Sequence, residues 1–134
     1  MLDSMEFTLE TIKEAHEKYT GVDFPKLIQE FKLMGMERNE YIVEDGRSIY
    51  VDISGKVLEI EGNQSIIPIN SISEKGEVKK IIKEHQAGKT DFATFCNQVA
   101  EAGVFKWVTR IDAMTCNYYD INDNLLVSEE IPSV

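Results

Sequence analysis

The chain has 134 residues, 43% of them hydrophobic, which is enough for one domain to bury a core without a metal or a disulfide. A formal net charge of −10 argues against binding to phosphate backbones or to anionic membrane surfaces. No apolar run approaches the roughly 20 residues needed to span a bilayer, and the N-terminus lacks the basic and apolar regions of a secretory signal, so we expect a cytoplasmic protein.

Two amphipathic helices are predicted first. Residues 8–19 place apolar side chains three or four positions apart, the spacing of one buried helix face. Asp23 is placed to cap a second helix, with Pro25 in the first turn, where its missing amide hydrogen costs nothing. Gly35 suits the left-handed residue that ends a helix. The buried face of the second helix is predicted to consist of Phe24, Leu27, Ile28 and Phe31.

Three strands are predicted next, at residues 38–44, 48–53 and 57–61, where the hydrophobic period changes from 3.6 to 2. Tight turns are predicted at Asp45-Gly46 and at residues 54–56. Residues 65–69 are expected to be extended, and Pro68 restricts them to an edge strand or a linker.

The second half starts with two more predicted helices. Ser71 and Glu74 have the spacing of a capping box, which predicts a helix that continues to His85. A fourth helix is predicted from Asp91, with Thr90 as an alternative cap. Its buried side chains are predicted to be Phe92, Phe95, Cys96 and Val99, and the helix is followed by strands at 104–112, 114–120 and 125–130.

The two halves resemble each other when the chain is shifted by 68 positions, the difference between 91 and 23. Identical residues then coincide at seven positions, and they include the presumed caps, the helix-ending glycines and a Tyr-x-Asp on the middle strand. We therefore predict a single domain over residues 1–134 with pseudo-repeats at about 8–61 and 72–130. The expected fold is α+β, with two helix-helix-three-strand units that form antiparallel sheet(s), pack against about four helices and share a core. The identical pairs are Asp23/Asp91, Phe24/Phe92, Gly35/Gly103, Tyr50/Tyr118, Asp52/Asp120, Leu58/Leu126 and Glu61/Glu129.

Few residues qualify as catalytic candidates. Cys96 occupies the position of Ile28 in the first half, so it is expected to be a buried structural thiol. The remaining weak candidates are Cys116, Tyr118, Asp120 and His85. For Tyr118 and Asp120 a proton-transfer pair competes with a tyrosine packed in the sheet. His85 and His16 both fall near the C-termini of their helices, where an imidazolium would meet the negative end of the helix dipole, and capping and packing is the favoured role for each.

No cofactor or metal is predicted. The sequence has no His-x-x-x-His or Cys-x-x-Cys spacing, no phosphate-binding glycine loop and no nucleophile elbow. The run at residues 120–124 is too short for a calcium-binding EF-hand loop.

Three segments resemble a known bacterial family. They are residues 16–25, residues 85–96 and Met-Thr-Cys-Asn-Tyr-Tyr-Asp at 114–120, together with the closing Glu-Ile-Pro. They look like the YbcV-like family, domain of unknown function 1398, whose members often carry the label "phage envelope protein". The resemblance implies a bacterial, prophage-associated cytoplasmic protein with an α+β fold, and it transfers no functional residues.

Three classes of function remain. The first, which we favour, is a protein-binding or self-associating module, such as a homodimer. A protein of this class would not be an enzyme. The second is a small-ligand-binding protein or an enzyme, which would need a pocket of a few hundred cubic ångström near the Cys116/Tyr118 strand, lined by residues such as Tyr50 and Trp107. The third is a prophage accessory factor that acts on a host protein. Neither nucleic acid nor membrane is expected as a partner.

Overall fold

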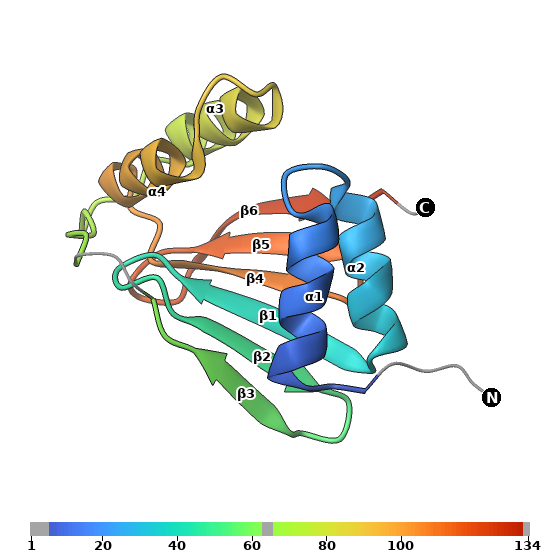
Figure 1. Cartoon of the computed structure of the whole chain (residues 1–134). Helices are drawn as coiled ribbons and strands as arrows, with labels where there is room; N and C mark the ends of the chain where they lie inside the picture. The colour runs from blue at the N-terminus through green and yellow to red at the C-terminus, as the bar shows by residue number, and fades with distance from the viewer. Residues whose placement is uncertain (1–5, 63–65, 133–134) are drawn as a thin grey trace.

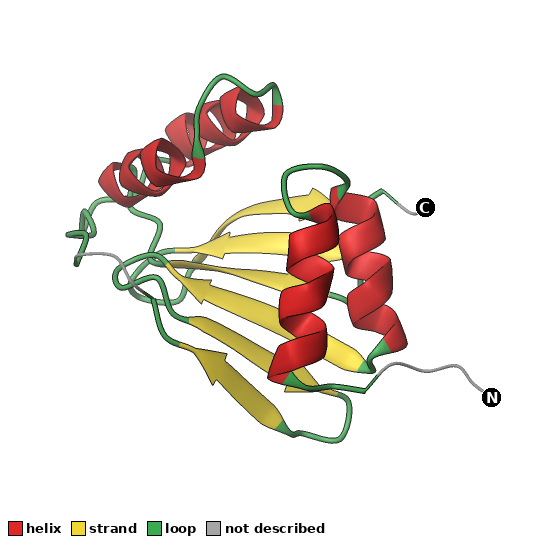
Figure 2. Cartoon of the chain, in the orientation of Figure 1, coloured by secondary structure: helices red, strands yellow, loops and turns green. Residues whose placement is uncertain are grey.

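The computed structural model describes residues 6–62 and 66–132, in which four helices accompany one six-stranded antiparallel sheet (Figures 1 and 2). The predicted α+β class is therefore confirmed. The helices are α1 (Leu9–Tyr19), α2 (Phe24–Leu33), α3 (Lys75–Gln86) and α4 (Phe92–Glu101). The strands are β1 (Met36–Ile42), β2 (Ser48–Asp52), β3 (Val57–Ile60), β4 (Lys106–Arg110), β5 (Thr115–Tyr119) and β6 (Leu125–Glu130).

The order of elements repeats, as the sequence predicted: two helices and three strands occur twice. The strand order is β3-β2-β1-β4-β5-β6, so the two units meet where β1 pairs with β4 and the rest follows in mirrored order on each side. The units thus share a single sheet. Their common ancestry stays a prediction.

Equivalent residues begin and end the equivalent helices α2 and α4. The carboxylate of Asp23 accepts a hydrogen bond from the Lys26 amide at 3.2 Å, and that of Asp91 accepts one from the Thr94 amide at 2.8 Å. Beyond the helix ends, Gly35 has φ +78° and Gly103 has φ +95°, the left-handed region that glycine enters without strain.

The predicted capping box at Ser71 and Glu74 is wrong. Helix α3 begins at Lys75, and the Glu74 side chain makes no capping hydrogen bond. The reason is tertiary, because the segment before α3 is held against the end of α4: the Glu74 amide donates to the Ala102 carbonyl, and the Asn70 amide to the Ala100 carbonyl, each at 3.0 Å. Residues 66–69 form no strand with the sheet, and residue 65 of that predicted extended segment lies outside the described residues.

The buried side chains form two hydrophobic clusters, not the single shared core that the sequence predicted. One cluster packs α3 and α4 on the sheet, and the other packs α1 and α2 on it. Each cluster nevertheless takes residues from both halves, since Val43 belongs to the α3/α4 cluster and Ile111 to the α1/α2 cluster. In Figure 1 the two helix pairs stand apart over the sheet.

The opposite face of the sheet carries a network of ion pairs. Arg38 contacts Glu40 at 2.9 Å and Lys106 contacts Glu40 at 3.7 Å, while Arg110 contacts Glu37 at 3.8 Å. These alternating charges suit a face in contact with water. In the described part of the chain, no helix has the length and apolar character that crossing a membrane requires.

Candidate functional site

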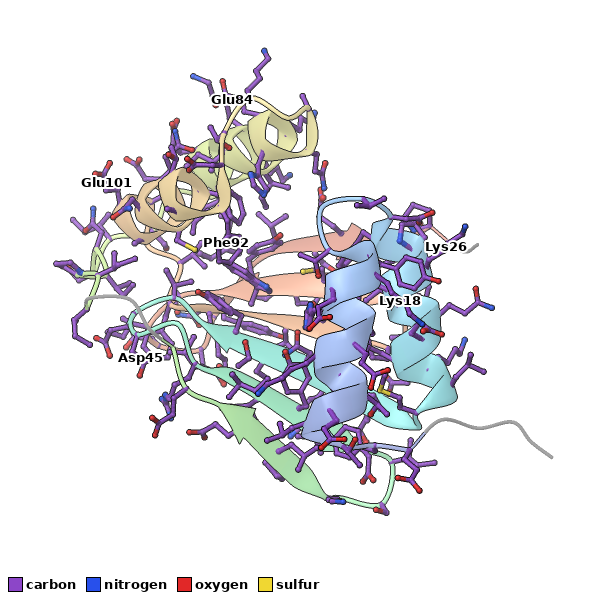
Figure 3. The ribbon with its side chains drawn as sticks, in the orientation of Figure 1. Lys18, Lys26, Asp45, Glu84, Phe92 and Glu101 are labelled. Atoms are coloured by element: carbon purple, nitrogen blue, oxygen red, sulfur yellow. The ribbon has the colours of Figure 1, made fainter. Side chains whose placement is uncertain are left out.

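A cavity of about 720 Å³ lies over the sheet between the two helix pairs. Its floor is the sheet face that the helices cover, and its sides come from all four helices. In Figure 3 the labelled Phe92 projects from α4 toward the space above the sheet. The side chains that line the cavity include His16, Phe31, Asn39, Tyr41, Ser48, Tyr50, His85, Gln86, Phe92, Phe95, Trp107, Thr109, Cys116, Tyr118 and Glu129.

One row of floor residues is polar. Directly paired residues of neighbouring antiparallel strands point to the same face, so the register places five cavity residues in a line across the sheet. Within this row the Thr109 hydroxyl lies 3.8 Å from the Cys116 Sγ. The row runs Tyr50, Asn39, Thr109, Cys116, Glu129 from β2 to β6.

The adjacent row of floor residues is mainly aromatic. It runs Ser48, Tyr41, Trp107, Tyr118 from β2 to β5. The rings of Tyr41 and Trp107 stack with centroids 4.6 Å apart, and those of Trp107 and Tyr118 are 5.8 Å apart. From α4, Phe95 approaches Trp107 at 5.5 Å. Such contacts hold the rings in fixed positions.

The floor is built from equivalent positions of the two units. Under the shift of 68 residues, Asn39 corresponds to Trp107 and Tyr50 to Tyr118. Tyr41 likewise corresponds to Thr109, and Ser48 to Cys116, and all of these residues line the cavity. The cavity therefore lies where the units meet, and the residues on its two sides differ although their backbone positions correspond.

His16 is the polar side chain that α1 contributes. Its Nδ1 lies 2.7 Å from the Thr20 hydroxyl and its Nε2 lies 3.1 Å from the Tyr50 hydroxyl. The Phe31 ring contacts the imidazole edge-on, with centroids 5.5 Å apart. Burial lowers the pKa of His16, so the imidazole is neutral at pH 7. The capping and packing role that the sequence favoured for His16 agrees with its contacts to Thr20 and Phe31, but burial favours the neutral ring over the imidazolium that a helix C-terminus would attract.

The α3 side of the cavity carries His85, Gln86 and Glu129. The His85 ring stacks on Phe95 with centroids 4.3 Å apart, and its Nδ1 lies 3.0 Å from the Thr90 hydroxyl. The Gln86 Nε2 donates to Glu129 Oε1 at 2.8 Å. Among the described residues, the second carboxylate oxygen of Glu129 has no hydrogen-bond partner.

Burial keeps the hydroxyls of Tyr50 and Tyr118 and the thiol of Cys116 protonated. It raises the pKa of Tyr50 and of Cys116, and it raises that of Tyr118 well above its ordinary value. At neutral pH these hydroxyls and this thiol are uncharged hydrogen-bonding groups. The floor between β2 and β5 is therefore neutral, and a carboxylate follows it on β6.

Of the four weak catalytic candidates, Cys116, Tyr118 and His85 line the cavity, and Asp120 does not. The Asp120 carboxylate instead accepts hydrogen bonds from the amides of Asn122 and Asn124, each at 2.9 Å. These bonds organise the turn between β5 and β6 and lower the pKa of Asp120. Asp52 binds the amide of Lys56 at 2.8 Å in the equivalent turn, so the shared Tyr-x-Asp pattern combines a floor tyrosine with a turn aspartate.

Two further sequence predictions concern burial. Cys96 is fully buried, as expected of a structural thiol, and burial raises its pKa to about 11. Phe24 and Phe92, in contrast, were predicted to be buried but are 47% and 48% exposed. They occupy the first turns of α2 and α4, where each helix reaches the edge of the cavity and not the packed interior.

Sequence reasoning missed several cavity residues, namely Asn39, Thr109 and Glu129. Strand alternation places Asn39 on the same face as Tyr41, and the shift of 68 residues relates it to Trp107. That signal was present in the chain. The pairing of β1 with β4, which brings Asn39 opposite Thr109, joins residues far apart in sequence and left no local signal.

Within residues 6–62 and 66–132, no three or more His, Cys, Asp or Glu side chains come together in a group that could hold a metal ion.

Comparison with known proteins gives a family and two relatives. The model of a family described as "Protein of unknown function (DUF1398)" matches residues 13–130. The chain is 31% identical over 75 residues to "Uncharacterized protein YcgX" of Escherichia coli (strain K12), covering 56% of each protein. It is 26% identical over 105 residues to "Uncharacterized protein Rv2012" of Mycobacterium tuberculosis (strain ATCC 25618 / H37Rv), covering 75% of this chain and 62% of that protein.

These matches span 56% and 62% of the lengths of the two relatives. None of the three descriptions names a phage or an envelope. The family match covers most of the chain and confirms the resemblance found in the sequence: the protein belongs to the DUF1398 family of proteins of unknown function.

Proposed function

We propose that this protein binds a small molecule in the cavity between its helix pairs. The observation that carries the proposal is the cavity itself, whose volume of about 720 Å³ falls in the range of roughly 300–1,000 Å³ typical of ligand sites. The sequence predicted that a ligand-binding protein of this kind would have a pocket lined by residues such as Tyr50 and Trp107 near the Cys116/Tyr118 strand, and all four residues line the cavity.

The composition of the lining supports binding of a partly apolar ligand. Rings from the sheet and from α4 supply apolar contact area, as Trp107 and Phe95 do, and fixed rings lose little conformational freedom on binding. A few polar groups, among them the His16 imidazole and the Tyr50 hydroxyl, are held in place by their mutual hydrogen bond. Such groups fix the orientation of a ligand.

A screen of small molecules by thermal unfolding tests the proposal. A ligand present at about 100 times its dissociation constant stabilises the folded state by about 2.7 kcal/mol, which raises the unfolding temperature measurably. The fluorescence of Trp107, the one tryptophan of the chain, reports whether the ligand enters the cavity.

The decisive variants are a matched pair. Asn39→Phe places a ring on the cavity floor and should abolish the stabilisation, whereas Asn117→Phe makes the same change on the opposite face of β5 and should preserve it. Stabilising ligands that bind Asn39→Phe as well as the wild type, or a diverse screen that shifts neither unfolding nor Trp107 fluorescence, would contradict the proposal.

Self-association is a second proposed function, supported by the free edges of the sheet. Within the described part of the chain, strands β3 and β6 each pair on one side only, and Val57 and Leu125 on them are 59% and 48% exposed. Unpaired strand edges can add a strand from a second copy. Sedimentation velocity measures it directly: a monomer at all concentrations up to the millimolar range would exclude it, and Val57→Lys should weaken a dimer formed through β3.

A further inference from the structure

The described lining of the cavity has an uneven distribution of charge. It contains neither lysine nor arginine, although the chain has 14 such residues. It does contain two carboxylates, those of Glu129 and Glu130, and Glu129 lies in the polar floor row opposite Cys116. His16 is neutral at pH 7, since burial lowers its pKa. An anionic ligand would therefore lose its hydration without gaining a fixed positive partner, which is costly in a partly buried site.

The Glu129 carboxylate is positioned to act on the cavity. The side chain is half-buried, and its Oε1 is held by Gln86 Nε2 at 2.8 Å. Its neighbour Tyr118 pairs with Val127, so Glu129 lies diagonally across from Tyr118 on the same face, within reach of a long side chain or a ligand. Burial raises the pKa of Cys116 and of Tyr118, and the charge of Glu129 adds to both increases, which indicates that its field reaches the floor.

Aromatic rings concentrate beside this carboxylate. Trp107 is 5.8 Å from Tyr118 and 5.5 Å from Phe95, measured between ring centroids. Of the equivalent positions in the first unit, Tyr50 carries a ring, whereas Asn39 and Leu27 do not. Tyr41 of the first unit adds a further ring, stacked on Trp107 with centroids 4.6 Å apart. The face of an aromatic ring attracts a cation, and tryptophan does so most strongly.

From these observations we propose that the cavity selects a small organic cation, an amine or quaternary ammonium attached to an apolar body. The cationic group lies between Glu129 and the rings of Trp107 and Tyr118, and the apolar body extends toward Phe31 and α1. The net charge of −10 favours the approach of the same class of ligand. This inference rests on the proposed small-molecule binding and specifies its ligand class.

The test compares three probes of nearly equal shape: phenyltrimethylammonium, its uncharged isostere tert-butylbenzene, and the anion benzenesulfonate. Binding to the full chain is measured at pH 8, where imidazoles are largely uncharged, by Trp107 fluorescence and by NMR chemical shifts. We expect the ammonium to bind about tenfold more tightly than the uncharged isostere, and the sulfonate to bind more weakly than either.

Two charge-removing variants locate the effect. Glu129→Gln should reduce the affinity for the ammonium about tenfold and leave that for tert-butylbenzene unchanged. Glu61→Gln is the matched control, because Glu61 is the equivalent residue of the first unit, is exposed and does not line the cavity. It removes the same charge and should leave both affinities unchanged.

The outcomes separate this inference from the proposed function. If tert-butylbenzene binds as tightly as the ammonium, or if Glu129→Gln has no greater effect than Glu61→Gln, the cation site is overturned while small-molecule binding stands. If none of the three probes changes the Trp107 signal and the wider thermal screen also fails, the proposed function itself is overturned. If the sulfonate binds more tightly than the ammonium, the cavity selects an anion and the proposed cation site is overturned.

Discussion

At the scale of single residues, the histidine of α1 shows how burial changes a chemical role. Its position near a helix C-terminus suggests a positive charge, yet the folded environment favours the neutral ring. Desolvation disfavours the charged form, and neither hydroxyl partner supplies a negative charge to offset it. The position along the helix was visible in the sequence, whereas the contact with Tyr50, 34 residues away, was not.

We predict that His16 titrates below the ordinary histidine value of about 6.5. Because the pKa is lower in the folded chain than in the unfolded one, the unfolded chain binds the proton more readily. The neutral His16 ring therefore contributes to the free energy of unfolding. This contribution is fully present above pH 6.5 and is lost as the pH falls from there through the pKa of the folded chain. NMR titration of the two imidazole signals measures it, with His16→Gln to assign them; a His16 midpoint at or above 6.5 would contradict the prediction.

A second residue-scale prediction concerns Cys96. Cys96→Val keeps the volume of a fully buried side chain and should change the free energy of unfolding by no more than about 1 kcal/mol. Cys96→Asp buries a carboxylate in the α3/α4 cluster and should cost about 4 kcal/mol or more, enough to unfold the protein. Chemical denaturation measures the first effect and circular dichroism the second. Rapid alkylation of Cys96 in the folded protein would be incompatible with its burial.

At the scale of elements, equivalent glycines end α2 and α4 in different surroundings. Both have positive φ angles, which a side chain adopts only with strain. A Cβ at Gly35 would have only Ile53 Cγ1 nearby, at 3.9 Å, whereas one at Gly103 would lie 2.6 Å from the Cα of Ser73. Residues 72 and 73, in the segment that precedes α3, therefore lie too close to Gly103 to leave room for a side chain.

We predict that Gly35→Ala costs about 1–2 kcal/mol of stability, the strain of a left-handed alanine. Gly103→Ala should cost clearly more, because backbone atoms of residues 72 and 73 must also move. Urea unfolding of the two variants, with unchanged m-values, gives the comparison. If the two variants lose the same free energy of unfolding, the close approach of Gly103 to Ser73 does not affect stability.

Local signals were sufficient for the elements but not for their assembly. Caps and glycines marked α2 and α4. Strand alternation put Cys116 and Tyr118 on the same face of β5 but left open which face that was. Phe24 and Phe92 were misjudged because periodicity identifies a helix face, not whether the first turn extends past the core. The capping pattern at residues 71–74 failed because the segment makes tertiary hydrogen bonds with α4.

At the scale of the whole molecule, the two units depend on each other through the sheet. Strands β1 and β4 pair along five residue pairs, and each hydrophobic cluster includes side chains from the other unit, Val43 in one and Ile111 and Ile131 in the other. Each unit alone would expose one edge of its three-stranded sheet and lose part of its cluster. A unit of about 60 residues buries a smaller fraction of its surface than a larger domain does and is marginal without those contacts.

We predict that residues 1–62 and 63–134, produced separately, are each largely unfolded, and that mixing them restores a folded complex. Circular dichroism and amide NMR spectra of each piece and of the mixture measure this, with the intact chain as the reference. A cooperative unfolding transition in either isolated piece would show that the unit folds on its own.

The separation of the two helix pairs bears on how much of the protein a cell retains. The cavity lies between the two hydrophobic clusters, so a ligand bound in it would contact side chains on both sides and bury more apolar surface. Unfolded chains are removed by proteases, and anything that binds only the folded form lowers their number. If the proposed small molecule binds in the cavity, the steady-state abundance of this protein would rise and fall with the supply of that molecule.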